Sequence, residues 1–129
     1  MADHVFKVAF PSNRSFSFNI LHVCDYHLPY DSLAYYLDYP GQIVNCGLEL
    51  TTGKISAKEV AKMFNRPFMG GLERKGALAT GTKDQIRTAV EKAFQDAPER
   101  FMLAADCTVP SETPWENLKT AIDLAHQHQ

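Results

Sequence analysis

From Asn19 onward, short apolar segments alternate with amphipathic ones, and this alternation limits the possible folds more than any other feature of the sequence. Strands that alternate with helices are typical of parallel βα units. Four such units can be counted in the chain. Their strands are expected at about residues 20–26, 43–48, 67–72 and 100–107. The predicted fold class is therefore α/β, with four parallel strands that are each followed by a helix.

The helices are predicted from the residues at which they begin. Ser56 is followed three residues later by Glu59, which is the spacing of a capping box. Thr82 precedes a segment whose apolar residues recur with the period of an α-helix. Cap and turn signals also predict two further helices, one near residues 31–37 and one from Thr113 onward, and a loop at residues 51–54.

The charge and the cysteine content exclude several classes of protein. Thirteen Lys and Arg residues against fifteen Asp and Glu residues give a formal net charge of −2, which lacks the basic excess of a nucleic-acid-binding protein. No apolar run is long enough to predict a membrane span, and no secretory signal is expected at the N-terminus. Three widely spaced cysteines argue against a disulfide framework and favour a cytoplasmic location with free thiols.

His22 and Cys24 form the most informative pair in the sequence. Residues i and i+2 of a strand point to the same face, so an imidazole and a thiol should project side by side from the first strand. Cys107 ends the fourth strand, and the functional groups of parallel barrels gather at the carboxyl ends of strands. One imidazole and two thiolates suit zinc and leave a fourth position open. Two alternatives remain: Cys46 as a substitute ligand, and buried cysteines that pack as small apolar residues.

Seven other residues near the strand ends are candidates for a shell or pocket around this site: Asp25, Asp106, Asn45, Glu49, Gly70, Gly71 and Arg74. The two aspartates flank the proposed ligands and either orient them or cap a turn. The asparagine and the glutamate line a pocket if their face of the second strand points inward. The glycines allow a ligand to approach the backbone, and the arginine either holds a carboxylate or phosphate or lies in a solvated loop.

Three segments carry a family resemblance: HVC at residues 22–24, GGLERKG at 70–76, and AADCTVPSETPWENLKTAIDLAH at 104–126. They resemble the uroporphyrinogen decarboxylase superfamily over about residues 19–128, with the best match to its cobalamin-dependent (corrinoid) methyltransferase branch. The superfamily fold is a (β/α)8 barrel. The methyltransferase branch has an H-x-C…C zinc site that activates a thiol to accept a methyl group.

This resemblance implies zinc ligands at His22, Cys24 and Cys107, a small-molecule thiol as substrate, and a methyl-corrinoid donor carried by a separate corrinoid protein. The decarboxylase of porphyrin biosynthesis uses no metal and depends on arginines and an aspartate from the N-terminal half of its barrel. Nothing in this chain matches that half. Decarboxylation is therefore kept as an alternative that would rest on the family label alone.

The size of the chain conflicts with a complete barrel. A (β/α)8 barrel typically needs about 250 residues, whereas this chain has only four βα units, which by the resemblance correspond to strands five to eight. The predicted organisation is an N-terminal arm or helix at residues 1–18 and a half-barrel domain at residues 19–129. Two bare sheet edges favour a homodimer that closes an eight-stranded ring.

The homodimer also bears on the metal site. In a flat sheet the first and fourth strands lie roughly 14 Å apart. The three ligands are therefore expected to meet across the dimer interface, unless one chain curls strongly. The alternatives are a domain-swapped assembly, a truncated and non-functional product, and a non-catalytic half-barrel that is a remnant or an assembly module.

Overall fold

The computed structural model describes residues 19–128, so the predicted N-terminal arm at residues 1–18 lies outside the described part. The strands of the main sheet are β1 (Ile20–Val23), β2 (Ile43–Cys46), β5 (Phe68–Leu72) and β6 (Phe101–Ala105). They are parallel and lie in the order β1-β2-β5-β6. The remaining elements are η2 (Ala34–Tyr36), β3 (Glu49–Leu50), β4 (Gly53–Lys54), α2 (Ala57–Phe64), α3 (Ala77–Thr80), α4 (Lys83–Gln95) and α5 (Trp115–Gln127). The predicted α/β fold with four parallel strands is confirmed, and it is consistent with half of a TIM barrel.

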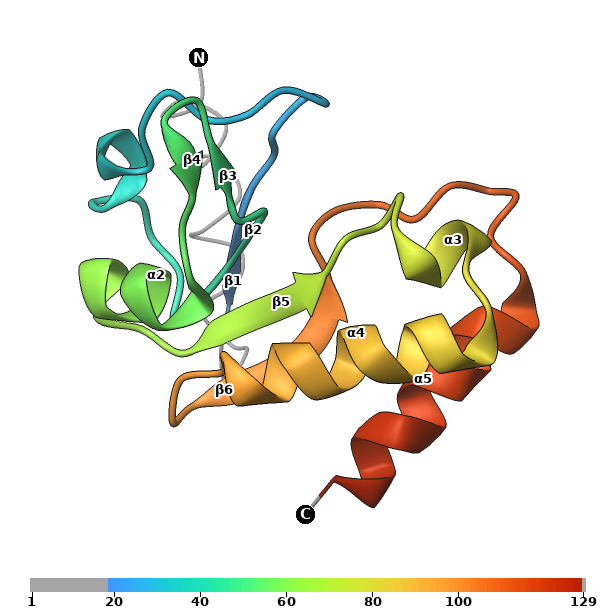
Figure 1. Ribbon diagram of the computed structural model, residues 1–129. Coiled ribbons are helices and arrows are strands. Elements are labelled where there is room, and N and C mark those ends of the chain that lie inside the picture. Colours follow the sequence, from blue (N-terminus) through green and yellow to red (C-terminus); the bar gives the residue numbers. More distant parts are fainter. Residues whose placement is uncertain (1–18, 129) are drawn as a thin grey trace.

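The main sheet is strongly curled. In Figure 1, β1 and β2 run steeply across the direction of β5 and β6. The register explains where the sheet turns. β2 and β5 pair only at Val44–Phe68 and Asn45–Met69, whereas β5 and β6 pair over five positions. Because the ladder between β2 and β5 is short, β1–β2 and β5–β6 can be inclined to each other as two pairs. The carboxyl ends of β1 and β6 can then approach each other.

Two hydrophobic clusters cover the outer side of the sheet. The first joins β1, β2 and β5 to α2 through Leu21, Val44, Val60 and Phe68. All four residues of β2 are buried, as expected for a central strand of a parallel sheet. The second cluster joins the end of β5 to α3, α4 and α5. The helices therefore lie on the outer side and leave the carboxyl ends of the strands free to carry polar groups.

Two of the predicted helices begin where their cap signals place them. The Ser56 hydroxyl accepts the N–H of Glu59, and the Glu59 carboxylate accepts the N–H of Ser56, which completes the capping box of α2. Thr82 and Gln85 form the same reciprocal pair at the start of α4. These reciprocal bonds satisfy backbone donors that the first helical turn leaves without partners.

Three local predictions are wrong. The helix expected at residues 31–37 is only the 3-10 turn η2, because the Ser32 hydroxyl accepts the N–H of Ala34 and forms a local turn instead. Residues 51–54 belong to the β3–β4 hairpin rather than to a plain loop. Thr113 does not cap α5: the N-cap is Pro114, and the Thr113 hydroxyl is buried without a hydrogen-bond partner.

The edges of the sheet are open within the described part of the chain, since neither β1 nor β6 has a second neighbouring strand there. The helix next to the β6 edge also exposes apolar side chains: Trp115 is 70% and Ile122 is 51% exposed on α5. Among the described residues no helix is long and apolar enough to cross a lipid bilayer.

Candidate metal centre at the carboxyl ends of the strands

The ligand atoms of His22, Cys24 and Cys107 all lie within 4.8 Å of one another. Cys24 Sγ is 3.9 Å from Cys107 Sγ, and Cys107 Sγ is 3.5 Å from His22 Nε2. His22 lies on β1, Cys24 directly follows β1, and Cys107 lies just beyond β6. The imidazole is exposed and both thiols are partly exposed, so the group is open to a ligand from solvent.

The expectation that these residues need two chains to meet is wrong. It assumed a flat sheet, in which β1 and β6 stand three strand spacings apart. The curl of the sheet, together with the short segment that carries Cys107 past the end of β6, brings all three residues together within one chain. The candidate metal site therefore does not depend on a partner copy.

Asn45 fixes the orientation of the His22 ring. Its amide nitrogen Nδ2 donates to the carbonyl oxygens of Met69 and Ala105, at 2.8 and 3.2 Å. This leaves Oδ1 as the acceptor that faces His22 Nδ1, so Nδ1 carries the proton. The lone pair of the imidazole is then on Nε2, on the side of Cys107. Orientation of a ligating imidazole through its other nitrogen is the usual arrangement in protein metal sites.

Cys46 occupies a different environment from the other two cysteines. It is 0% exposed in the core beneath the site, and it does not belong to the His22, Cys24 and Cys107 group. Burial raises the pKa of the Cys46 thiol to about 12, because the apolar surroundings disfavour the thiolate. The structure thus places Cys46 as a packing residue and not as the substitute ligand.

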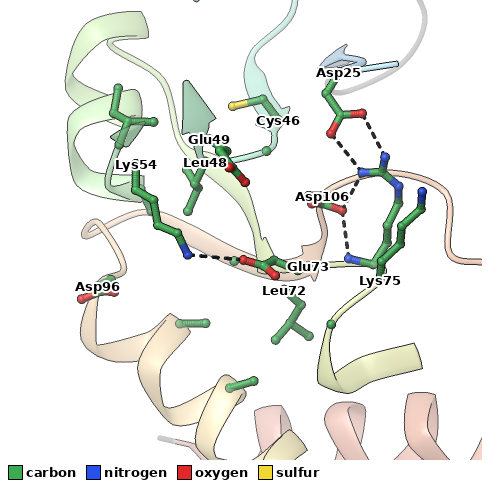
Figure 2. Close-up of a pocket in the computed structure, with 18 of the residues that line it drawn as sticks. Asp25, Cys46, Leu48, Glu49, Lys54, Leu72, Glu73, Lys75, Asp96 and Asp106 are labelled. Carbon is green, nitrogen blue, oxygen red and sulfur yellow. Dashed lines mark hydrogen bonds and ion pairs between the residues drawn. The ribbon is translucent and has the colours of Figure 1, made fainter. Parts of the chain in front are cut away.

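Arg74 joins the two aspartates that flank the candidate ligands. It lies in the turn after β5, and its side chain is 7% exposed. Its guanidinium donates two hydrogen bonds to Asp25, at 3.0 and 3.2 Å, and one to Asp106 at 3.2 Å. Its backbone N–H also donates to Asp106 at 3.0 Å. In Figure 2 the carboxylates of Asp25 and Asp106 turn toward the same guanidinium group.

The electrostatics of this cluster follow from its burial. Burial alone raises the pKa of Asp25, but hydrogen bonds from the Arg74 guanidinium and the His27 backbone N–H outweigh it and leave that pKa below the usual carboxyl value. Asp25 also caps a local turn, because its carboxylate accepts the His27 N–H at 2.9 Å. Arg74 therefore has its charge neutralised inside the protein and is not the free anion-binding cation considered from the sequence.

The sequence did not indicate that the His27 ring contacts the cationic groups of Arg74 and Lys75. His27 Nδ1 lies 2.9 Å from Lys75 Nζ and 3.1 Å from Arg74 Nη2, so it accepts hydrogen bonds from cationic groups. Tyr26 and His27 both have positive φ values, 51° and 68°, which non-glycine residues seldom adopt. The segment that follows Cys24 and Asp25 is thus held in an uncommon backbone conformation beside the site.

The other predicted pocket residues have different roles. Glu49 is exposed on β3 and lines the cavity described below, whereas Asn45 faces His22. Gly70 and Gly71 lie inside β5: a Cβ on Gly71, whose φ is 101°, would be 3.0 Å from the Ala93 Cβ of α4, and one on Gly70 would be 2.8 Å from the Phe68 ring. The two glycines therefore allow close packing of the strand, and Gly71 also lines the cavity described below.

A cavity of about 890 Å³ lies beside the arginine cluster and is lined in part by Asp25, His27, Tyr30 and Arg74. Figure 2 shows Lys54 and Glu73, which form an ion pair across it. The Tyr30 hydroxyl donates to the carbonyl of Val23 and accepts the N–H of Gly47. These bonds tie the ends of β1 and β2 together at the wall of the cavity.

The donor set fits zinc better than it fits a hard cation. Zinc is bound by imidazole nitrogen and thiolate sulfur, whereas magnesium and calcium require oxygen ligands. Three protein ligands with one open position are typical of a catalytic zinc site, whereas structural sites are closed by four. The exposed side of His22 is consistent with such an open position.

Comparison with known proteins places the chain in a family. A family model described as uroporphyrinogen decarboxylase (URO-D) matches residues 19–128. Among solved structures, a methyltransferase from Methanosarcina mazei is similar in fold, with a TM-score of 0.67 at 20% sequence identity. The similarity covers 98% of this chain and 38% of the methyltransferase. None of the curated proteins matches the chain significantly. Because the family model matches most of its length, the chain belongs to the uroporphyrinogen decarboxylase family.

Proposed function

We propose that this domain carries a zinc site for methyl transfer from a corrinoid to a thiol, with His22, Cys24 and Cys107 as ligands. The observation that carries the proposal is the convergence of one imidazole nitrogen and two sulfurs within 4.8 Å, with the imidazole oriented by Asn45. The family model fixes the family but is described as a decarboxylase, so support for methyl transfer comes from the solved structure of similar fold, which is a methyltransferase.

Zinc held there would lower the pKa of an incoming thiol and present it as a thiolate at neutral pH. The chain itself supplies the open face beside His22, through which a small thiol can enter. In the proposed transfer, the thiol sulfur would form a bond to the methyl carbon of the donor as the cobalt–carbon bond breaks. The electron pair of that cobalt–carbon bond would remain on cobalt, and the thiol proton would pass to solvent. The corrinoid would be carried by a separate protein, and a reducing, cytoplasmic compartment would keep both cysteines available as thiols.

Zinc content and thiol methylation test the proposal together. The purified chain, reduced and then supplied with zinc, should retain one equivalent after gel filtration. It should also convert free methylcobalamin and 2-mercaptoethanol to the methyl thioether, which is followed by the visible spectrum of the corrinoid. Cys24→Ser and Cys107→Ser should lose zinc, whereas Cys46→Ala should retain it.

Other results would decide against the proposal. If the chain binds no zinc under these conditions, the alternative of a non-catalytic half-barrel is favoured. Its cysteines and histidine would then be side chains that bind no metal. Zinc without thiol methylation would reduce the site to a structural role. Porphyrin decarboxylation by the zinc-free chain would restore the alternative that rests on the family label.

We also propose that a second copy of this chain completes the sheet. Both edges of the four-stranded sheet are open within the described residues, and the chain covers 38% of the methyltransferase of similar fold. Two copies related by a two-fold axis would place β6 of each beside β1 of the other and form eight parallel strands. Light scattering at micromolar concentration should give about twice the 14.5 kDa of one chain. A monodisperse monomer at 14.5 kDa would contradict this arrangement.

A further inference from the structure

The buried ion cluster lies next to the candidate ligands in both the sequence and the fold. Asp25 directly follows Cys24, and Asp106 directly precedes Cys107. Both carboxylates bind one arginine, whose side chain is almost entirely buried. The cluster therefore connects the two chain segments that carry the thiols.

We propose that Arg74 is a positioning residue that sets the separation of the Cys24 and Cys107 thiols by holding Asp25 and Asp106 on one guanidinium group. This inference rests on the proposed metal site, because it states how that site is preorganised. It assigns Arg74 no contact with substrate or metal.

The sheet alone does not fix the separation of the two thiols. β1 and β6 are the outer strands of the sheet and share no ladder hydrogen bonds within the described residues. The segments beyond their ends are therefore joined through side chains. The fork of Arg74 on Asp25 uses both terminal nitrogens, and one of them also reaches Asp106. A planar, bidentate fork fixes direction as well as distance, which a single point charge does not do.

The hydrogen bonds of Arg74 also argue against a role in binding a substrate anion. Both terminal nitrogens already contact carboxylates, and Nη2 also contacts His27. The backbone N–H is used as well, since it donates to Asp106. Asp106 is held further by its own N–H, which donates to the Leu72 carbonyl at 2.9 Å. A group so fully engaged within the protein suits alignment of neighbouring segments.

Arg74→Met tests the inference, because it removes the fork and keeps a side chain of similar length. The matched control is Arg66→Met. Arg66 is a half-buried arginine that donates to the Leu37 carbonyl, away from the cysteines. Both changes are made in a Cys46→Ala background, so that only Cys24 and Cys107 can form a disulfide.

Two readouts separate positioning from simple stabilisation. The first is zinc affinity, measured by competition with a chromophoric chelator. The second is the effective concentration of the two thiols in metal-free protein. Here two protein thiols and one oxidised glutathione exchange to one protein disulfide and two reduced glutathiones. Both are measured at a temperature at which circular dichroism shows each variant to be folded.

We expect Arg74→Met to weaken zinc binding by about 10- to 100-fold and Arg66→Met to change it by less than about twofold. The effective thiol concentration should fall by about tenfold in Arg74→Met and stay unchanged in Arg66→Met. Arg74→Lys should recover only part of each loss, because an ammonium cannot form the planar fork. If Arg74→Met does not fold, Asp106→Asn replaces it, since that change leaves the Arg74–Asp25 pair in place.

Equal zinc affinity and equal thiol concentration in the Arg74 and Arg66 variants would overturn the inference and leave Arg74 as a structural residue. Failure of the proposed function gives a different result. If the parent chain binds no zinc, the metal site is wrong, and the glutathione readout alone then decides whether Arg74 positions the two thiols.

Discussion

Two regions of the molecule differ in how far a single chain provides their hydrogen bonds and their burial. We call them the mouth of the sheet and the β6–α5 flank. The mouth comprises His22, Cys24, Asn45, Arg74 and Cys107 at the carboxyl ends of the strands. The flank is the apolar face of β6 and α5, with a shallow groove of about 320 Å³ lined by residues that include Leu103, Val109, Trp115, Leu118 and Ile122. In the mouth, the asparagine and the arginine have their hydrogen bonds within the chain.

In the flank, by contrast, large apolar side chains are left exposed to solvent. Its largest side chain, Trp115, is mostly exposed, and Ile122 is half exposed although it lies on the apolar stripe of α5. Contiguous exposed apolar side chains are a feature of surfaces that bind another protein, and this flank is where the proposed second copy is tested. The difference teaches that the chemistry of the candidate site and the closure of the barrel are separable. One chain brings the candidate ligands together, whereas the flank keeps apolar side chains exposed that the proposed second copy would cover.

The largest effect we expect is the difference in alkylation rate between Cys46 and the two cysteines of the mouth. With a pKa of about 12, Cys46 at pH 8 has a thiolate fraction of about 1 in 10,000, so it should react with iodoacetamide roughly 1,000-fold more slowly than an ordinary exposed thiol. Mass spectrometry of the metal-free native protein should therefore show two alkylated cysteines, Cys24 and Cys107. Rapid labelling of Cys46 would extend the mouth into the core and reopen its role as a ligand.

The second effect tests whether the ion cluster stabilises the mouth. Arg74→Met leaves Asp25 and Asp106 buried without their cation, and loss of one partner of a buried pair typically costs about 3–5 kcal/mol. We expect the free energy of unfolding in urea at pH 7 to fall by about 3 kcal/mol, the low end of that range, because both carboxylates keep some solvent contact. The exposed pair Lys119–Asp123 provides the control, and Lys119→Met should cost less than about 1 kcal/mol.

The pH dependence of the free energy of unfolding tests the contribution that Asp25 makes through its bonds to Arg74. The pKa of Asp25 is lowered in the folded state, so its stabilising contribution is fully present above the ordinary carboxyl pKa and is lost as the pH falls through the lowered value. The difference between the parent chain and Arg74→Met should therefore be fully present at neutral pH and shrink in acid, as Asp25 becomes protonated first in the variant and then in the parent chain. A difference that grows in acid would contradict the assignment.

The helices and strands of both regions could be predicted from the sequence better than the contacts between them. The boundaries of α2 and α4 follow from local capping chemistry at Ser56 and Thr82, which needs only neighbouring residues. The pairing of His22 with Cys24 follows from strand periodicity in the same way. Their meeting with Cys107 within one chain does not, because the curl of the sheet depends on the short β2–β5 ladder.

Two residues that the sequence did single out, Asn45 and Arg74, show the same limit in their contacts. Asn45 was a pocket candidate, but its bond to His22 spans 23 residues, and its bond to the Ala105 carbonyl spans 60. Arg74 was considered as a ligand for anions because a loop arginine gives no local sign of internal partners. Those partners lie 49 and 32 positions away along the chain. Pairings that depend on which strand ends converge cannot be read from spacing alone.

The third effect tests the flank. Ile122→Lys places a charge in the apolar groove beside β6, and loss of a hot-spot residue of an interface weakens association by about 2 kcal/mol or more. If Ile122 is such a residue of the proposed dimer, the dissociation constant measured by sedimentation should rise at least about 30-fold, with zinc content unchanged because the candidate ligands meet within one chain. Tyr35→Lys is the control, since this exposed aromatic residue on η2 lies outside the flank. Loss of zinc together with loss of the dimer would join the two regions that the structure separates.

The smallest effect concerns the orientation of the His22 ring. Asn45→Ala removes the acceptor at His22 Nδ1, so the proton can move between the two ring nitrogens and the lone pair is no longer kept on Nε2. Loss of such an orienting partner typically weakens metal binding by 10- to 100-fold, and we expect about tenfold because the exposed ring can also use water as a partner. Asn117→Ala is the matched control. Asn117 Nδ2 also donates to two carbonyl oxygens, those of Leu78 and Gly81, but it lies outside the mouth. Both variants should lose stability, and only Asn45→Ala should bind zinc more weakly. If the two bind zinc equally, the orientation of His22 does not contribute to the site, and the metal affinity resides in the two thiols.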